Sequence, residues 1–309
     1  MTATINTALD ELATTEPLAV VEPRLFRRAL VSLWRDPVAL ISILVVVALA
    51  VVAILAPYFS PYNPNHIFLN GLSADGAPIH PDSAFLLGTD PNGRDVLSRL
   101  IYGDRVSLLV GVIATGLASI IGVIVGAIAG YVGGVVESIL MRVTDVVLSF
   151  PILLFCIALI TVTGPSTRNV VLVIAFGYWT YLARIVRSLV LSLKEREFVT
   201  AAHTLGVGHV KILRRHILRH LVPTIIVYST LGVATSILIE ASLSYLGIGV
   251  PVPEASWGQM ISQGQQYFQI APWLLIAPGI ALIITVLAFN LAGDWLTDLL
   301  DPVTTEIGR

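Results

Sequence analysis

The sequence predicts an all-α polytopic membrane protein with six transmembrane helices. Of its 309 residues, 56% are hydrophobic and only 12% are charged, about half of the roughly 25% that a soluble domain carries. The mean hydropathy is +0.86, and six segments each hold about the 20 mostly apolar residues that a helix needs to cross a bilayer. Helices are expected for these segments because lipid cannot satisfy the free backbone groups of open strands.

The six expected spans differ in their polar content. The third contains Asp145 and Pro151, two arginines lie near the end of the fourth, and the fifth contains Glu240. In chain order, the spans are 38–57, 106–131, 139–162, 170–191, 221–247 and 272–291.

Composition also excludes several functions. A net charge of −2 provides no basic field for nucleic acid. The single Cys156 cannot form an internal disulfide, the histidines lack metal-site spacing, and no GxxxxGK[ST] phosphate loop occurs. The spans hold only isolated acids, which disfavours an integral membrane enzyme. They show no clear repeat of the kind expected in an ion-coupled secondary transporter. Neither catalytic nor metal-ligating residues are therefore expected.

Basic residues set the expected orientation. With the N-terminus inside, 14 of the 18 Lys and Arg residues lie in cytosolic segments and four in outer segments, as the positive-inside rule requires. Both termini are then cytosolic, with a disordered tail at 1–23 and a short tail at 304–309. Residues 24–37 combine arginines with apolar residues at helical spacing, which predicts an amphipathic interfacial helix; a polar collar on the first span is the alternative. Residues 58–105 form the expected extracytoplasmic loop, and residues 106–303 form a five-helix core.

The cytosolic loop at 192–220 is long enough to need its own structure. Phe198, Ala201, Ala202 and Leu205 recur at the spacing of one helix face, which predicts a short amphipathic helix over 197–205 that ends at Gly206. Such a helix can fill a groove in a soluble partner. The alternative is an interfacial helix that only anchors the loop.

Small residues repeat along the second span. Gly122, Gly126 and Gly130 recur every fourth residue and present a smooth face that permits close contact with another helix. We expect helix packing here rather than direct contact with a transported solute.

Charged residues near the expected outer face are further candidates. Glu240 lies near the expected outer end of the fifth span. One interpretation is contact with a solute or the binding protein; the other is a carboxylate at the headgroup level or an internal hydrogen-bonding partner. Arg94 and Asp95 belong to a segment of mixed charge before the second span, which predicts an exposed outer surface with internal ion pairs. These two residues are also candidates for contact with the solute path or the binding protein. In the third span, Arg142 and Asp145 are three residues apart and are expected to pair.

Several segments resemble one family of transport proteins. The stretch TAAHTLG at 200–206 resembles the EAA-xxx-G motif of ABC importer permeases, with Ala201, Ala202 and Gly206 matching and Thr200 in place of Glu. Further along, Arg219 stands where that motif has Pro. The segments LGTDPNGRDVLSRLIYG, EASLSYLGIGV, SWGQM and LAFNLAGDWLTDLLDP, at 87–103, 240–250, 256–260 and 287–302, resemble the C-type subunits of the dipeptide, oligopeptide and nickel importers.

The resemblance implies a type I importer permease in the bacterial plasma membrane. In that family the motif helix couples the permease to the ATPase, which would involve Glu197, Phe198, Thr200, Ala201, Ala202, Leu205 and Gly206 here. The implied partners are a homologous second permease, two cytosolic ATPase subunits and an extracytoplasmic binding protein. ATP and Mg would be bound by the ATPase subunits and no cofactor by this chain. Di- or oligopeptides are the expected solutes, with nickel chelate, glutathione or another small solute as alternatives.

Overall fold

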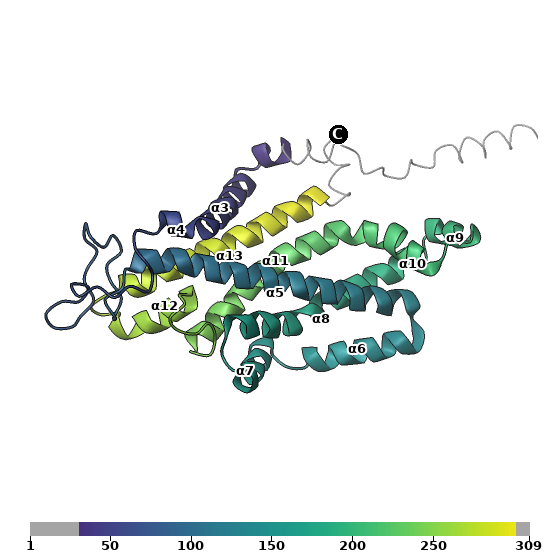
Figure 1. Cartoon of the computed structure of the whole chain (residues 1–309). Coiled ribbons are helices and arrows are strands. Elements are labelled where there is room, and N and C mark those ends of the chain that lie inside the picture. Colours follow the sequence, from purple (N-terminus) through teal and green to yellow (C-terminus); the bar gives the residue numbers. More distant parts are fainter. Residues whose placement is uncertain (1–30, 301–309) are drawn as a thin grey trace, which may run out of the picture.

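The computed structural model describes residues 31–300, in which helices and loops account for the whole chain and no strand occurs. The long helices lie side by side as an elongated bundle (Figure 1). In order, the elements are α3 (Pro37–Ile54), α4 (Ala56–Phe59), α5 (Val96–Val132), α6 (Gly134–Leu148), α7 (Ile152–Thr163), α8 (Thr167–Lys194), α9 (Glu197–Thr204), α10 (His209–Lys211), the π-helix η1 (Ile212–Ile217), α11 (Leu218–Tyr245), α12 (Trp257–Gly264), the 3₁₀-helix η2 (Gln265–Tyr267) and α13 (Trp273–Leu300).

Five helical segments are long and apolar enough to cross a membrane by themselves: α3, α5, α8, the continuous run from α10 through η1 to α11, and α13. The remaining expected span, the third in chain order, corresponds to the pair α6 and α7, which are bent by 87° relative to each other. The all-α class and the multi-pass architecture are thus confirmed. The expectation of one continuous third span is corrected to two helices with a sharp break.

Proline chemistry explains the break. α6 ends at Leu148, and Pro151 lies directly before the first residue of α7. Proline lacks a backbone N–H group and disfavours the helical conformation of the residue before it. The Ser149 hydroxyl and backbone N–H groups bond back to carbonyls of the last turn of α6, which closes that helix.

Side-chain caps set two other helix starts. Asp36 accepts hydrogen bonds from the backbone N–H groups of Val38 and Ala39, and Pro37 occupies the first position of α3. Asp95 likewise accepts from the N–H group of Ser98 and starts α5 at Val96. The helix therefore extends ten residues into the segment expected as the loop 58–105. The tails and residues 24–30, the first half of the expected interfacial helix at 24–37, lie outside the described residues, although residues 31–35 are helical.

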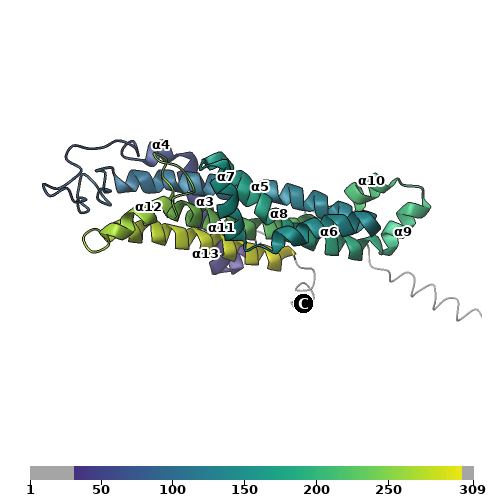
Figure 2. The ribbon, with the colours of Figure 1, turned by 90° about the horizontal axis from the view of Figure 1, so that it is seen from below.

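The bundle is organised around α5, which packs most extensively against α8 and next against α11 (Figures 1 and 2). Residues 60–95 form an irregular cap at one end of the bundle, and α9 lies at the opposite end. Tyr62, Phe68 and Phe85 hold the cap together through ring centroids 4.9–5.9 Å apart. The two ends of the bundle thus carry the two groups of residues that the sequence singled out.

Candidate functional site

α9 is a short helix held at the end of the bundle by its own sequence. It begins at Glu197 and ends at Thr204, followed by Gly206 with a φ of +75°. This left-handed conformation suits glycine and lets the N–H group of Val207 reach the carbonyl of Ala202 at 3.1 Å. Gly206 therefore turns the chain sharply back toward η1.

One face of α9 packs against the chain itself. Val199 and Ala202 are 1% and 6% exposed and join a cluster with Ile212, Ile217 and Leu221. The ring of Phe198 stacks on His220 with centroids 5.1 Å apart. Of the face expected to dock on a partner, Phe198 and Ala202 thus serve to anchor the helix.

The remaining face of α9 is open. Leu205 is 82% exposed, and Glu197, Thr200 and Ala201 are also exposed. An isolated large apolar side chain in this position, on a helix fixed from behind, can insert into a pocket of another protein. The structure thus divides the predicted residues into an anchoring set and an exposed set, a division that helical spacing alone did not provide.

The anchoring cluster extends into the bundle. Besides α9, η1 and α11, it includes Ala127 of α5 and Leu182, Val186 and Val190 of α8. The hydroxyl group of Tyr131 at the end of α5 also lies 3.0 Å from Nδ1 of His209. A force applied to α9 would therefore reach three membrane-spanning helices through packed side chains.

The three glycines of the second span all face α8. A Cβ atom added to Gly122, Gly126 or Gly130 would lie 2.7, 2.4 or 2.8 Å from a backbone oxygen of α8, respectively. Real Cβ atoms do not approach oxygen that closely, so only glycine allows this distance between the two helices. Their position fits the expected packing role.

Glu240 is fully buried between α5 and α11, with no exposed surface in this chain. Its carboxyl group accepts hydrogen bonds from the hydroxyl groups of Ser107 at 2.9 Å and Ser244 at 2.7 Å. These are the internal partners expected in one of the two sequence-based interpretations. Further along the same interface, the hydroxyl groups of Thr115 and Ser236 lie 2.9 Å apart.

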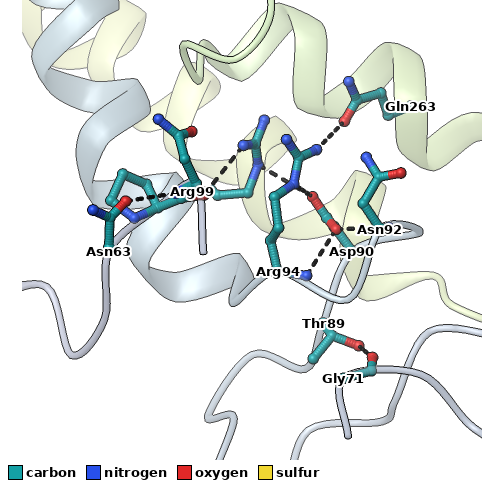
Figure 3. Close-up of polar contacts among 10 residues, drawn as sticks. Asn63, Gly71, Thr89, Asp90, Asn92, Arg94, Arg99 and Gln263 are labelled. Carbon is teal, nitrogen blue, oxygen red and sulfur yellow. Dashed lines mark hydrogen bonds and ion pairs between the residues drawn. The ribbon is translucent and has the colours of Figure 1, made fainter. Parts of the chain in front are cut away.

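The charged segment before α5 forms a buried network rather than an exposed surface (Figure 3). Arg94 and Asp95 are 4% and 1% exposed, which corrects the prediction of exposed pairs. Nε of Arg94 lies 2.7 Å, and Nε of Arg99 3.3 Å, from the carboxylate of Asp90. Residues 60–95 fold over these side chains and bury them. Hydropathy does not predict this burial, because it does not show which loop covers a charged segment.

Asp90 is the residue that sequence reasoning missed. Besides the two arginines, its carboxylate accepts the backbone N–H groups of Asn92 and Arg94 at 2.8 and 3.0 Å. The signal lay in the run TDPNGR, because Asp followed by Pro, Asn and Gly is typical of a turn closed by the Asp side chain. One carboxylate therefore holds both the turn and the arginine pair.

The motifs singled out near the expected outer face meet in space. Nε1 of the buried Trp257 in α12 donates to the carbonyl of Leu100 in α5 at 3.1 Å. The Arg94 guanidinium group reaches Gln263 at 3.5 Å, as Figure 3 shows. Segments 87–103, 240–250 and 256–260, which are distant in sequence, thus form one end of the bundle.

The expected pair of Arg142 and Asp145 is replaced by pairs between helices. Asp145 of α6 binds Arg184 of α8 at 2.5 Å, and Glu137 of α6 binds Arg187 of α8. The reason is geometric, because α8 runs beside α6 and presents its arginines at the same height. Within residues 31–300, no group of three His, Cys, Asp or Glu side chains could hold a metal ion.

The five apolar helical segments that are long enough to cross a membrane define a multi-pass membrane protein. The family described as binding-protein-dependent transport system inner membrane component matches residues 122–306, and the N-terminal domain of oligopeptide transport permease C matches residues 24–77. The chain belongs to this family, as the C-type permease subunit of an ABC importer in the dipeptide, oligopeptide and nickel group.

Individual relatives agree with this assignment. The dipeptide transport system permease protein DppC of Escherichia coli K12 is 44% identical over 87% of this chain and 90% of its own length. The nickel transport system permease protein NikC of the same strain is 39% identical over 88% and 95%. A solved structure of the MetNI methionine ABC transporter, at 18% identity, covers 66% of this chain and 97% of its own with a TM-score of 0.55, which supports the fold.

Family membership also gives the cellular location of the protein and its role in a larger complex. The chain is a multi-pass protein of the bacterial inner membrane and a permease subunit, not the ATPase of its transporter. The family implies a partner permease, ATPase subunits and a substrate-binding protein.

Proposed function

We propose that this chain forms half of the translocation path of an importer for di- or oligopeptides. In the proposed complex it pairs with one homologous permease, two ATPase subunits dock on the cytosolic side, and one extracytoplasmic binding protein delivers the solute. Both chain termini and α9 then lie in the cytosol, as the distribution of basic residues favours. ATP and Mg are bound by the ATPase subunits.

The observation that carries this proposal is the division of α9 into an anchored and an exposed face. A helix that transmits force must be fixed to the part that moves and free toward the part that pushes. Val199 and Ala202 provide the first property, and the exposed Leu205 provides the second. Coupling also requires that α9 makes different contacts in the two states of the transporter, because a contact of equal strength in both states shifts no equilibrium.

The choice of solute depends on the relatives and on the domain at the N-terminal end. DppC is named for dipeptide transport and NikC for nickel transport, and their identities to this chain are similar. The peptide assignment rests on the oligopeptide permease domain at residues 24–77. Nickel chelate and glutathione are the alternatives.

The experiment is to purify the complete transporter with its binding protein, reconstitute it in liposomes, and measure ATP hydrolysis and uptake with each solute. We expect stimulation of both by dipeptides or short peptides. Stimulation by nickel chelate or glutathione alone would identify that compound as the transported solute and would leave the proposed subunit architecture unchanged. ATPase activity that no solute changes, together with no uptake, would overturn the proposal.

A further inference from the structure

The cleft between α6 and α8 is a polar feature that neither packing nor coupling explains. The side chains of α6 that line it, Glu137, Ser138, Met141, Arg142 and Asp145, recur at the spacing of one helix face. Arg184 and Arg187 of α8 form the other wall, and the cleft measures 550 Å³, within the roughly 300–1,000 Å³ of small-molecule sites. The two helices run beside each other in both views (Figures 1 and 2).

The opposite face of α6 is apolar. Val135, Ile139 and Val143 are between 51% and 75% exposed and point away from the cleft residues by helical spacing. A helix with one charged and one apolar face inside a membrane protein turns the charged face toward water or protein. α6 therefore separates an apolar environment from a polar one.

The distance of Asp145 and Arg184 from the helix ends supports a polar environment on this face of α6. Arg184 lies ten residues before the end of α8 at Lys194, which places it about 15 Å along the axis from that end. Asp145 lies eleven residues into α6, or about 16 Å from its start. Their side chains are 55% and 49% exposed. The short Asp145 side chain cannot extend to the membrane surface as a long arginine can, so this exposed pair requires water or a polar partner.

The charges of the cleft do not cancel. Asp145 pairs with Arg184, and Glu137 pairs with Arg187, which joins α6 to α8 at two heights. Arg142 is exposed and forms no salt bridge with a residue in the range 31–300. The cleft thus carries one excess positive charge, which attracts an anionic group.

We propose that this cleft is a water-filled section of the solute path, in which Arg142 meets a carboxylate group of the passing solute. The inference rests on the proposed function, and it adds that the path binds a carboxylate group of the solute at the cleft between α6 and α8. The two ion pairs hold the walls together, and Arg142 is the cation of the cleft without a salt bridge to any residue within 31–300. A carboxylate is the group that the guanidinium fork binds with two parallel hydrogen bonds.

Thiol labelling in the assembled transporter tests the inference. Cys156 is fully buried, so Ser138→Cys supplies the only accessible thiol in the described part of this chain, and labelling is read on this chain by mass. In inside-out membrane vesicles, we expect the thiol at position 138 to react with charged methanethiosulfonates. The matched variant Ile139→Cys, on the apolar face of α6, should not react.

The charge of the reagent tests the role of Arg142. Relative to a free thiol, position 138 should favour the anionic sulfonatoethyl reagent over the cationic trimethylammonium reagent, and Arg142→Gln should lower that ratio by about threefold. Arg168→Gln removes an exposed arginine at the other end of α8 and should leave the ratio unchanged. A ratio that Arg142→Gln does not alter would overturn the carboxylate assignment.

Other outcomes identify other occupants. Protection of position 138 from both reagents means that the partner permease fills the cleft, and protection that disappears when anionic lipid is removed means that a lipid headgroup does. Either result overturns the inference. A separate measurement distinguishes a failure of this inference from a failure of the proposed function. The unaltered transporter is reconstituted in liposomes with its binding protein, and the proposed function fails only if uptake is absent there.

Discussion

The hydroxyl group of Ser107 on α5 donates a 2.9 Å hydrogen bond to the carboxyl group of Glu240 on α11. Ser244, one turn further along α11, donates to the same carboxyl group at 2.7 Å. Together with the pair Thr115–Ser236, these contacts form a buried polar connection between the two helices. Glu240 therefore stabilises a helix interface, whatever else it contacts in the assembled transporter.

Glu240→Leu should destabilise this interface. The substitution leaves the hydroxyl groups of Ser107 and Ser244 buried without their acceptor, at a cost of about 1–3 kcal/mol. We expect a lower thermal unfolding temperature of the purified complex, and a smaller decrease for Glu240→Gln, which keeps an acceptor oxygen. The control is Ser242→Ala, which removes an exposed hydroxyl group on the same helix. Equal stability of Glu240→Leu and the control would show that the connection is not structural.

Gly126→Ala should disrupt the contact between α5 and α8. Its added Cβ atom would lie 2.4 Å from the carbonyl oxygen of Ala183, and such overpacking costs about 1–3 kcal/mol. Gly116→Ala is the matched control, because a Cβ atom at Gly116 on the same helix meets nothing within 4 Å. We expect a reduced yield of assembled complex only for Gly126→Ala. Normal yield and uptake for both variants would refute the packing role.

Asp90→Asn should loosen the cap. The substitution removes the negative charge that the buried guanidinium groups of Arg94 and Arg99 share, and breaking a buried pair costs about 3–5 kcal/mol. We expect faster proteolysis within residues 60–95 of the complete transporter. Asp75→Asn, in an exposed part of the same segment, is the control. If both variants are cleaved at the rate of the unaltered protein, Asp90 does not hold the cap.

Hydropathy was sufficient to predict the class of fold and five of the six spans. Runs such as that of α3 carry no charge, and in a bilayer this property alone determines that the segment is helical and where it lies. The break at Pro151 was missed because a proline within a span is compatible with a kinked helix as well as with two separate helices. Hydropathy alone does not distinguish these two outcomes.

The sequence predicted which segments carry polar or amphipathic sites, but it did not predict which residues those sites contact. The spacing of Phe198, Ala201, Ala202 and Leu205 correctly indicated a helix over this segment, yet Val199 supplies the deeper anchor. Helical spacing gives the faces of a helix but does not say which face another element covers. For the same reason Asp145 was paired with its sequence neighbour, whereas the structure pairs it with Arg184 on another helix.

The division of α9 also changes which variants test coupling. Ala202→Asp would place a charge among Ile212, Ile217 and Leu221, so we expect it to release α9 from the bundle and destabilise the loop. A charge at this position therefore cannot separate lost docking from lost folding. A charge at Leu205 can, because this side chain is 82% exposed and a charge there stays in contact with water.

The central claim is that the exposed face of α9 docks on the ATPase subunits, and copurification of those subunits with Leu205→Asp tests it most directly. Leu69→Asp, at a fully exposed position in the cap, is the control at the opposite end of the bundle. We predict unchanged thermal stability of the permease for both variants and a loss of ATPase binding of at least about tenfold for Leu205→Asp alone. Full ATPase binding and full uptake by Leu205→Asp would contradict the claim.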